Sequence, residues 1–362
     1  MKTNLNDKKE IATKILAWYD QNARSLPWRI SPAKIKEGFK PDPYEVWLSE
    51  IMLQQTTVKT VIPYFQNFIT LWPTLFDLSK AQDYEILEAW AGLGYYRRAS
   101  NLIKCASLLC KKFHCNFPTE EAELRKLPGV GNYTAAAISA IAFNNRSVVI
   151  DGNVERVISR LFAIQTPIRK SKNTIKNFAE ELTPSHRVGD YSQSIMDLGA
   201  LICKPKNPKC SLCPIKSFCS AYKKDLVSVI PRKEKKKLRP LRLGFAFLAL
   251  TNSNEFLTLR RPAQGLLGGM IALPCSEWLE KKLPTFSPPF EAKWEPVEMS
   301  VKHSFTHFDI QLKIVKGYIS KVPKIYEQQP IATIDLEKFP TLFKKVLIKG
   351  LEKELYFKSS QT

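Results

Sequence analysis

The stretch LRKLPGVGNYTAAAISAIA, residues 124–142, decides the fold that we predict for this chain. Gly129 and Gly131 permit a tight turn with exposed backbone N–H groups, and the Ala-rich segment after the turn indicates a helix. The positive end of that second helix could hold a phosphate group without reading base sequence. Taken alone, however, such a turn is more often a plain connection between two helices.

The segments around this hairpin predict two different kinds of domain. From residue 8 to about 202, apolar residues recur at helical spacing, and residues 42–72 read as one helical segment. After PRKEKKKLRPLR (231–242), short alternating runs such as HSFTHFDIQLKIVKGYI (303–319) precede a closing helix, which indicates an α+β domain. We therefore expect a helical region over 1–228, a basic linker over 229–242 and an α+β domain over 243–356. A DNA-facing linker and a plain tether explain the basic segment equally well.

Composition and charge point to a polyanionic partner. The 362 residues include 55 Lys and Arg against 34 Asp and Glu, a formal charge of +21, while 44% hydrophobic residues exclude wholesale disorder. The partner could be nucleic acid or an anionic membrane surface, and 20 Phe with seven Trp favour nucleic acid. Because we find neither a signal peptide nor an apolar run of about 18 residues, we expect a cytosolic protein without a membrane span.

Four of the eight Cys lie within 17 residues, in the pattern C-x6-C-x2-C-x5-C. Four thiolates so close together can surround either Zn²⁺ or a [4Fe–4S] cluster, and their spacing alone favours zinc slightly. We predict these four as metal ligands: Cys203, Cys210, Cys213 and Cys219. In a reducing compartment the scattered remainder are expected to be free thiols: Cys105, Cys110, Cys115 and Cys275.

Several motifs together resemble one enzyme family. WLSEIMLQQTTVKTVIPYF (47–65), WAGLGYYRRASNL (90–102), the hairpin LPGVGNYTAAAI and DGNVERV are similar to the iron–sulfur branch of the helix-hairpin-helix DNA glycosylase superfamily, and most closely to adenine DNA glycosylases of the MutY type. The resemblance implies an all-α helix-hairpin-helix core with an iron–sulfur loop at 203–219, followed by an α+β Nudix-like domain. It also implies that the cofactor is a [4Fe–4S] cluster.

Two carboxyl groups suit the cleavage of a glycosidic bond, which needs a proton donor and a negative group beside the cationic sugar. Glu50 shares a helix face with Val46 and Leu53, whose apolar side chains would favour its protonated form. Asp151 precedes a predicted helix, so it could be a plain N-cap that also faces the sugar. The resemblance makes Glu50 the general acid for adenine N7 and Asp151 the stabiliser of the transition state.

The resemblance also assigns helpers at the sugar and the reaction type. Tyr133 and Asn153 match positions that assist at the sugar and its phosphate. Lyase members carry a Schiff-base Lys where this chain has Tyr133, and residues 128–151 contain no Lys. We therefore expect a monofunctional glycosylase that leaves an abasic site.

Further positions match those that contact DNA in the family. By resemblance, the adenine pocket contains Arg24, Leu53 and Asp197, although some relatives have Glu in place of Asp197. The resemblance also implies that DNA contacts the chain at Gln55, Tyr95, Gly129 and Gly131. The element matching the reader of 8-oxoguanine is Phe305-Thr306-His307, in a domain that lacks the Nudix hydrolase box.

The leading hypothesis is therefore base excision repair of adenine paired with 8-oxoguanine or guanine in double-stranded DNA. We expect a monomer at the nucleoid in the cytoplasm. One alternative is an endonuclease III-like glycosylase-lyase for oxidised pyrimidines. Another is an iron–sulfur DNA-binding regulator without catalytic activity.

Overall fold

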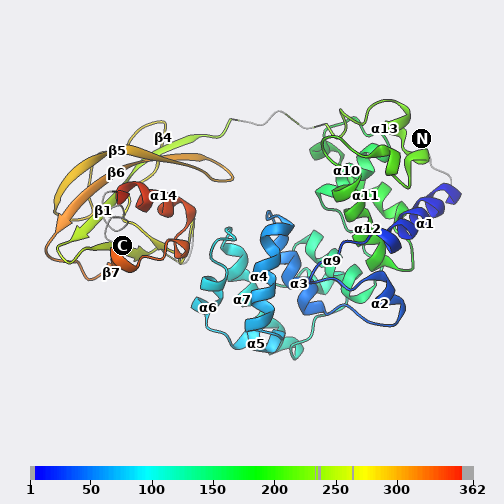
Figure 1. The fold of residues 1–362 in the computed structure, drawn as a ribbon, viewed down its shortest axis with the longest axis horizontal. Helices are drawn as coiled ribbons and strands as arrows, with labels where there is room; N and C mark the ends of the chain where they lie inside the picture. Colours follow the sequence, from blue (N-terminus) through cyan, green and yellow to red (C-terminus); the bar gives the residue numbers. More distant parts are fainter. Residues whose placement is uncertain (1–4, 233, 235–237, 263–264, 353–362) are drawn as a thin grey trace, which may run out of the picture. The chain divides into compact units, whose positions relative to one another are not determined.

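A computed structural model of the chain forms two compact units. One consists of residues 1–89 and 98–235, and the other of residues 236–362 with the short segment 90–97. The first unit is helical and the second contains a β-sheet (Figure 1), which confirms the predicted fold class. The residues that the structure describes are 5–232, 234, 238–262 and 265–352.

Parts of two predicted segments lie outside the described residues. These parts are residues 233 and 235–237 of the expected linker and residues 353–356 of the expected C-terminal domain. Among the helices that are described, none combines the length and the apolar character needed to cross a membrane.

Short helices joined by turns build the first unit. In chain order they are α1 (Leu5–Asn22), α2 (Pro32–Lys36), α3 (Pro43–Leu53), α4 (Val58–Leu71), α5 (Leu75–Lys80), α6 (Asp83–Ala89), α7 (Arg97–Phe113), α8 (Glu121–Leu124), α9 (Asn132–Phe143), α10 (Gly152–Leu161), α11 (Ile168–Leu182), α12 (Val188–Leu201) and α13 (Ser220–Lys223), with 3-10 turns at Cys210–Leu212 and Lys216–Phe218. A core of buried aliphatic side chains joins α1 and α9 to α10, α11 and α12. This core fixes the ends of α9, α10 and α12 relative to one another.

The segment predicted as helical over 42–72 is two helices, α3 and α4. Asp42 caps α3 by accepting a hydrogen bond from the Tyr44 N–H at 2.8 Å, and Pro43 occupies the first turn, where a missing N–H costs nothing. The break follows Leu53, because Gln55 has a left-handed backbone (φ 60°) and Thr57 caps α4. The turn between the two helices therefore projects Gln55 outward.

The predicted hairpin joins α8 to α9. Gly129 has φ 78°, and a Cβ there would lie 2.8 Å from the Cβ of Asn101, so both the backbone and the packing require glycine. Gly131 has an extended backbone and is the N-cap of α9, and an added Cβ would meet nothing within 4 Å. The protein's own packing therefore demands glycine at the first position only.

A mixed β-sheet forms the second unit, with strand order β3-β2-β1-β6-β5 and with β4 and β7 pairing β1 and β2. Strands β1 and β6 are parallel along their length, whereas β5 is antiparallel to β6. The run predicted over 303–319 is interrupted by a turn in which the Phe305 N–H donates to the Phe308 carbonyl. The elements are β1 (Leu241–Thr251), β2 (Glu255–Arg260), β3 (Ile271–Ala272), β4 (Leu279–Glu280), β5 (Lys293–Ser304), β6 (Asp309–Ile319), β7 (Glu327–Pro330), 3-10 turns at Ile331–Thr333 and Leu336–Lys338, and α14 (Thr341–Gly350).

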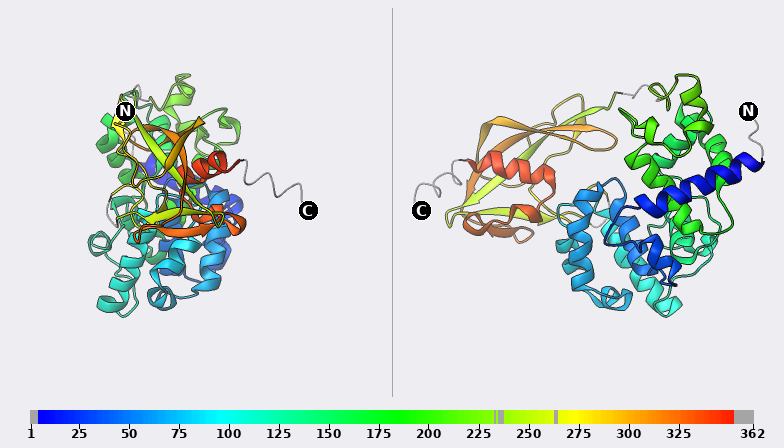
Figure 2. Two further views of the ribbon diagram at one scale, coloured as in Figure 1. Left: turned by 90° about the vertical axis from the view of Figure 1, so that its left-hand side faces the viewer. Right: turned by 45° about the vertical axis from the view of Figure 1, so that its right-hand side comes forward.

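Helix α14 covers one face of this sheet (Figure 2). Its residues Phe343 and Leu347 pack in one cluster with Leu248 of β1 and Ile314 of β6. A smaller cluster that includes Trp294 lies against Ala249 and other buried residues. The second unit therefore has its own hydrophobic core, with side chains buried on both faces of the sheet.

One sequence expectation about the cysteines is wrong. Cys110 and Cys115 form a disulfide bond, although both were expected to be free thiols. After α7 the chain reverses through left-handed backbone at His114 and Cys115, and the Cys115 N–H donates to the Leu109 carbonyl. This reversal carries Cys115 back beside the last turn of the helix. Cys105 and Cys275 are free, as predicted.

Candidate active site

A cavity of about 360 Å³ lies in the first unit, between α3, the start of α9, the start of α10, and α12. Its volume is in the range of small-molecule sites. Six of the residues that were predicted from the sequence to act at the site line it: Arg24, Glu50, Leu53, Tyr133, Asp151 and Asn153. The chain thus brings together groups that are up to 129 residues apart in sequence, since Arg24 and Asn153 share the cavity wall.

Glu50 is a buried acid on the floor of this cavity. Its side chain belongs to the buried face of α3, and its residue exposure is 6%. The pKa of Glu50 is raised to about 7, chiefly because burial disfavours the carboxylate and also because the Asp151 charge is nearby. Tyr133 and Arg29 act in the opposite direction. Within the described part of the chain, Glu50 Oε2 has no hydrogen-bond partner. The carboxyl can therefore be protonated near neutral pH and donate to a bound group.

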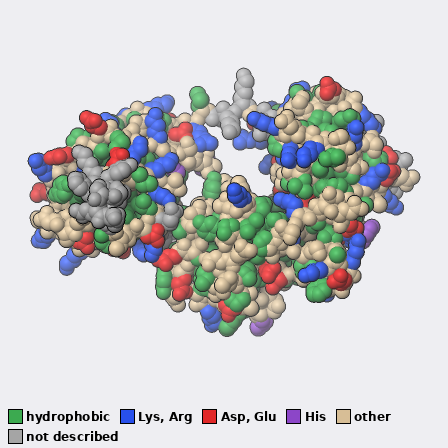
Figure 3. Space-filling view, viewed as in Figure 1, with side chains coloured by type: hydrophobic (Ala, Val, Ile, Leu, Met, Phe, Trp, Pro, Cys, Tyr) green, Lys and Arg blue, Asp and Glu red, His purple; other side chains and the backbone are tan. Residues whose placement is uncertain are grey.

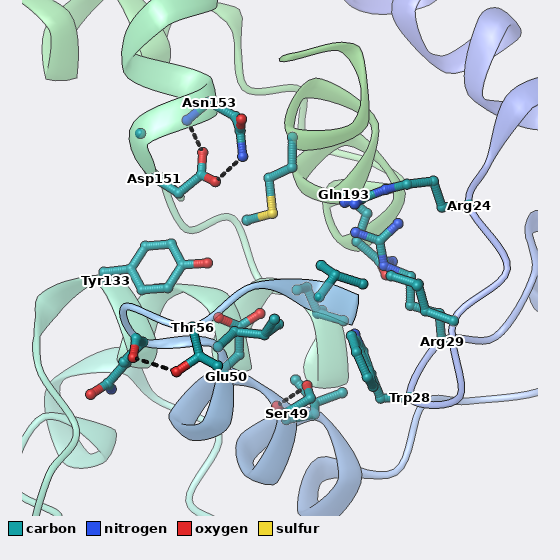
Figure 4. Close-up of a pocket in the computed structure, with 18 residues that line it drawn as sticks. Arg24, Trp28, Arg29, Ser49, Glu50, Thr56, Tyr133, Asp151, Asn153 and Gln193 are labelled. Atoms are coloured by element: carbon teal, nitrogen blue, oxygen red, sulfur yellow. Dashed lines mark hydrogen bonds between the residues drawn. The ribbon is translucent and has the colours of Figure 1, made fainter. Parts of the chain in front are cut away.

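Asp151 lies across the cavity from Glu50, and the Tyr133 ring points into the space between them (Figure 4). Asp151 is the N-cap of α10, as predicted, and accepts from the N–H groups of Asn153 and Val154 at 2.9 and 2.7 Å. The side-chain amide of Asn153 also donates to it at 2.6 Å. These three donors hold the Asp151 carboxylate in one orientation.

Asp197 is completely buried and is absent from the cavity lining that the described residues form. Its carboxylate accepts hydrogen bonds from two arginines that do line the cavity, Arg24 and Arg29. Asp197 therefore contacts the predicted pocket residue Arg24 directly but, unlike Arg24 and Leu53, does not line the cavity formed by the described residues.

Sequence reasoning missed three residues around the cavity. Arg29 and Gln193 line it directly, and Gln193 lies beside Arg24 in Figure 4. Arg98, which is 8% exposed, donates to the carbonyls of Ile51 and Met52 and to the Thr56 hydroxyl, so it holds the end of α3. Arg29 closes the motif LPWR (26–29), which is part of the family resemblance, but nothing in the sequence indicated that Asp197 is its partner.

Two of the four predicted DNA-contact positions, Gln55 and Tyr95, have an unusual backbone. Gln55 and Tyr95 are exposed and left-handed, with φ 60° and 48°, although neither is glycine. Such backbone costs energy and is often retained at functional sites, but ten further non-glycine residues in the described chain also have it. Gly129 and Gly131 lie at the hairpin described above, beside the N-terminus of α9.

The predicted reading element lies in the second unit, at the turn between β5 and β6. Phe305 is half-buried, stacks on Trp278 with ring centroids 6.1 Å apart and contacts Phe308. Thr306 and His307 are exposed at the tip of the turn. Phe305 therefore anchors the turn, and its two neighbours are available to a ligand.

The four predicted ligand cysteines line a second, smaller cavity of about 30 Å³: Cys203, Cys210, Cys213 and Cys219. Arg160, which is 2% exposed, donates to Cys203 Sγ at 3.3 Å and to the carbonyl of Lys204. Lys206 and Lys209 of the same loop are exposed, and Lys and Arg side chains are visible around this end of the unit in Figure 3. Four thiols with a buried cation beside them fit an anionic thiolate cluster.

Comparison with known proteins agrees with this geometry. The description "HhH-GPD superfamily base excision DNA repair protein" fits residues 48–185, "iron-sulfur binding domain of endonuclease III" fits 203–219, and "NUDIX domain" fits 245–349. An adenine DNA glycosylase of Buchnera aphidicola subsp. Schizaphis graminum is 36% identical over 308 residues, which are 82% of this chain and 84% of that protein. This chain belongs to the adenine DNA glycosylase family.

Other adenine DNA glycosylases and one solved structure extend the comparison. The human adenine DNA glycosylase is 43% identical over 210 residues, covering 57% of this chain and 38% of that protein. A thermostable thymine-DNA glycosylase superposes with a TM-score of 0.53 and 29% identity, over 60% of this chain and 98% of that structure. The predicted family and its DNA repair activity are confirmed by these relatives.

Family membership also decides the cofactor question that cysteine spacing left open. The loop over 203–219 is an iron–sulfur binding domain, so the cofactor is a [4Fe–4S] cluster and not zinc. The four cysteines that line the small cavity would hold it, with the Arg160 guanidinium offsetting part of its negative charge.

We expect the purified protein to be yellow-brown and to contain about four iron atoms per chain, because four thiolates complete one cubane cluster. Replacing Cys213 by Ser should remove most of the visible absorbance and the iron. The matched control is Cys275→Ser in the second unit, which should retain both. Stoichiometric zinc without iron after anaerobic preparation would contradict the assignment.

Proposed function

We propose that this adenine DNA glycosylase hydrolyses the N-glycosidic bond of adenine paired with 8-oxoguanine or guanine in duplex DNA. The observation that carries the proposal is the buried Glu50 carboxyl, whose pKa of about 7 leaves a proton available, in one cavity with Asp151. A proton donor and a fixed carboxylate are the two groups that glycoside hydrolysis requires.

In this proposal Glu50 donates its proton to adenine N7, which makes the base a neutral leaving group. The Asp151 carboxylate stabilises the positive charge that develops on the sugar. Three hydrogen-bond donors already orient Asp151, so little rearrangement is needed during the reaction. Tyr133 and Asn153 assist at the sugar and its phosphate.

Base recognition would use the other cavity residues. A flipped adenine can pack on the apolar side chain of Leu53, while Arg24 and Gln193 supply polar contacts to its edge. Gln193 has both a donor and an acceptor, which suits a purine that carries both. Asp197 takes part through the arginines that it holds and not through the base.

The duplex would be held at the hairpin and at two projecting turns. Gly131 leaves open space where its Cβ would be, so a DNA phosphate can approach the backbone at the start of α9. Gln55 would contact bases and Tyr95 would fill the gap left by the flipped nucleotide. Gly129, with its left-handed backbone, keeps the hairpin turn in the shape that lets a phosphate approach.

The C-terminal domain would read the opposite base. The exposed Thr306 hydroxyl and His307 ring can bond the edge of 8-oxoguanine, with Phe305 as their anchor. The proposal keeps the division into a catalytic region (1–228), a linker (229–242) and a reading domain (243–356). It also takes the protein to work as a monomer on nucleoid DNA in the cytoplasm.

The reaction should be purely hydrolytic. No Lys lines the cavity in the part of the chain that the structure describes, and Tyr133 stands where lyase relatives of the superfamily carry their amine. A duplex with adenine opposite 8-oxoguanine should therefore remain uncut after incubation and break at the adenine site only after alkali. Trapping of a covalent complex by borohydride, or cutting without alkali, would favour the endonuclease III-like alternative.

A further inference from the structure

Asp197 is buried on α12 behind the cavity wall, and both of its carboxylate oxygens accept hydrogen bonds from arginines. Its Oδ1 accepts from Arg24 Nε at 2.6 Å and its Oδ2 accepts from the Arg24 backbone N–H at 3.0 Å. One guanidinium nitrogen of Arg29 donates to both oxygens at 2.9 Å. With 0% exposure, the carboxylate has no solvent contact through which it could be screened.

The two arginines connect Asp197 to the reacting region. Both line the cavity from the loop after α1, and the Arg29 side chain is only 8% exposed. Arg29 is also the cation that lowers the pKa of Glu50 and of Tyr133. How strongly the Arg29 charge lowers the pKa of Glu50 therefore depends on how far Asp197 neutralises that charge.

We propose that Asp197 is a positioning residue that holds Arg24 and Arg29 in the cavity wall and neutralises enough of their charge to keep Glu50 protonated. The inference rests on the proposed role of Glu50 as the proton donor. It differs from a base contact, because Asp197 acts only through the two arginines.

Other charged and titratable groups lie around these residues. Glu50 is influenced by Tyr133 from α9, by Asp151 at the start of α10 and by Arg29. Asp197 influences Tyr19 of α1, which also senses Asp190, but the pKa of Tyr19 lies far above neutral and the group stays uncharged. Arg29 is therefore the cation through which Asp197 can act on Glu50.

The sign of the effect follows from this arrangement. In Asp197→Asn the amide no longer neutralises the guanidinium groups, so the field of Arg29 on Glu50 becomes more positive. A positive field favours the carboxylate and lowers the pKa of Glu50. Because the proton donor is active only when protonated, the decline of the rate with rising pH should begin at lower pH.

The test measures single-turnover adenine release by the full-length holoenzyme between pH 5.5 and 8.5. For the wild type the rate should fall above about pH 7. In Asp197→Asn this decline should move down by about one pH unit, so that the rate at pH 8 is about tenfold lower while the rates at pH 5.5 differ less. Asp197→Glu, which keeps the charge, should return the decline toward its wild-type position.

The matched control is Asp190→Asn on the same helix. Asp190 is also buried and pairs with an arginine, Arg187, at 2.8 Å, but neither residue lines the cavity formed by the described residues. Its profile should coincide with that of the wild type. A second variant, Arg29→Gln, removes the positive charge near Glu50 and should move the decline of the rate to higher pH. It tests the same charge effect if Asp197→Asn does not fold.

A purely structural role of Asp197 would lower the rate by the same factor at every pH, and that result would overturn the inference. An unmoved decline in Asp197→Asn, or in Arg29→Gln, would overturn it as well. A wild-type enzyme that releases adenine without any decline above pH 7 would instead remove Glu50 from the acid role, which the inference presupposes. A decline that moves to lower pH in Asp197→Asn and to higher pH in Arg29→Gln would support both the role of Asp197 and the acid role of Glu50.

Discussion

Replacing Glu50 by Gln is expected to lower the rate of adenine release by about 10³-fold or more, while the affinity for the duplex changes little. The amide keeps the size and polarity of the carboxyl but cannot deliver a proton, and general acid catalysis alone contributes about 10²–10⁴-fold. The side chain is buried at the floor of the cavity, so its substitution leaves the DNA-facing surface unaltered. Single-turnover rates and a binding titration on the same duplex measure the two effects.

The same variant should be more stable than the wild type above neutral pH. The folded pKa of Glu50, about 7, exceeds its ordinary value of 4.5, so the wild type loses stability as the pH rises through 7. A shift of this size corresponds to about 3 kcal/mol, which Gln avoids. Thermal unfolding of both proteins should differ at pH 8 and converge below pH 4.5.

Glu45→Gln is the matched control for both measurements. Glu45 lies in the first turn of the same helix and is absent from the cavity lining among the described residues. The control should retain adenine release close to that of the wild type. Residual turnover in Glu50→Gln comparable to the control would remove Glu50 from the acid role.

Deleting residues 233–362 is expected to reduce the preference for 8-oxoguanine over guanine opposite the adenine by about tenfold, while basal adenine release persists. The first unit contains Glu50 and Asp151, whereas the reading turn with Thr306 belongs to the second. Binding energy from a remote part of the substrate can be used to drive base flipping, so its loss should affect discrimination more than basal chemistry.

The fragment for this experiment should end at Arg232. Ile230 is 1% exposed in the first unit and its carbonyl accepts a hydrogen bond from the buried Arg160 at 2.8 Å, while the Arg232 carbonyl accepts from Ile168. Ending the chain at residue 228 would leave Arg160 without this partner. The measured quantity is the ratio of single-turnover rates on the two duplexes.

Two full-length variants complement the fragment. Thr306→Val removes the exposed hydroxyl but keeps the shape of the side chain, and it should lower the preference ratio in the same direction. Thr333→Val makes the same change at another exposed threonine of the second unit and should leave the ratio unchanged. A ratio that survives both the deletion and Thr306→Val would mean that this domain does not read the opposite base.

The sequence predicted best what depends on local pattern. Helical periodicity placed Glu50 on a buried face beside Val46 and Leu53, and the residue before a helix start made Asp151 an N-cap; the structure has both features. Motif spacing predicted the family and the loop of four cysteines. Each of these inferences needed only residues that are close in the chain or a pattern already typical of a family.

Features that depend on unfavourable backbone or on distant partners could not be predicted. The break after α3 uses left-handed Gln55, and the disulfide follows left-handed His114 and Cys115, where no glycine marks the turn. Asp197 meets Arg29 across 168 residues, and only the tertiary packing of α12 against the first loop brings them together. Sequence resemblance therefore assigned Asp197 to the pocket without indicating that it lies behind two arginines.

Chromatography of the released bases tests whether this chain frees adenine from a damaged pair. The full-length protein is incubated with duplexes that contain adenine opposite 8-oxoguanine or opposite thymine. We expect free adenine from the first duplex, at most traces from the second, and DNA strands that stay intact until alkali is added. Tight binding of the first duplex without release of adenine, or release of oxidised pyrimidines from other duplexes instead, would contradict it.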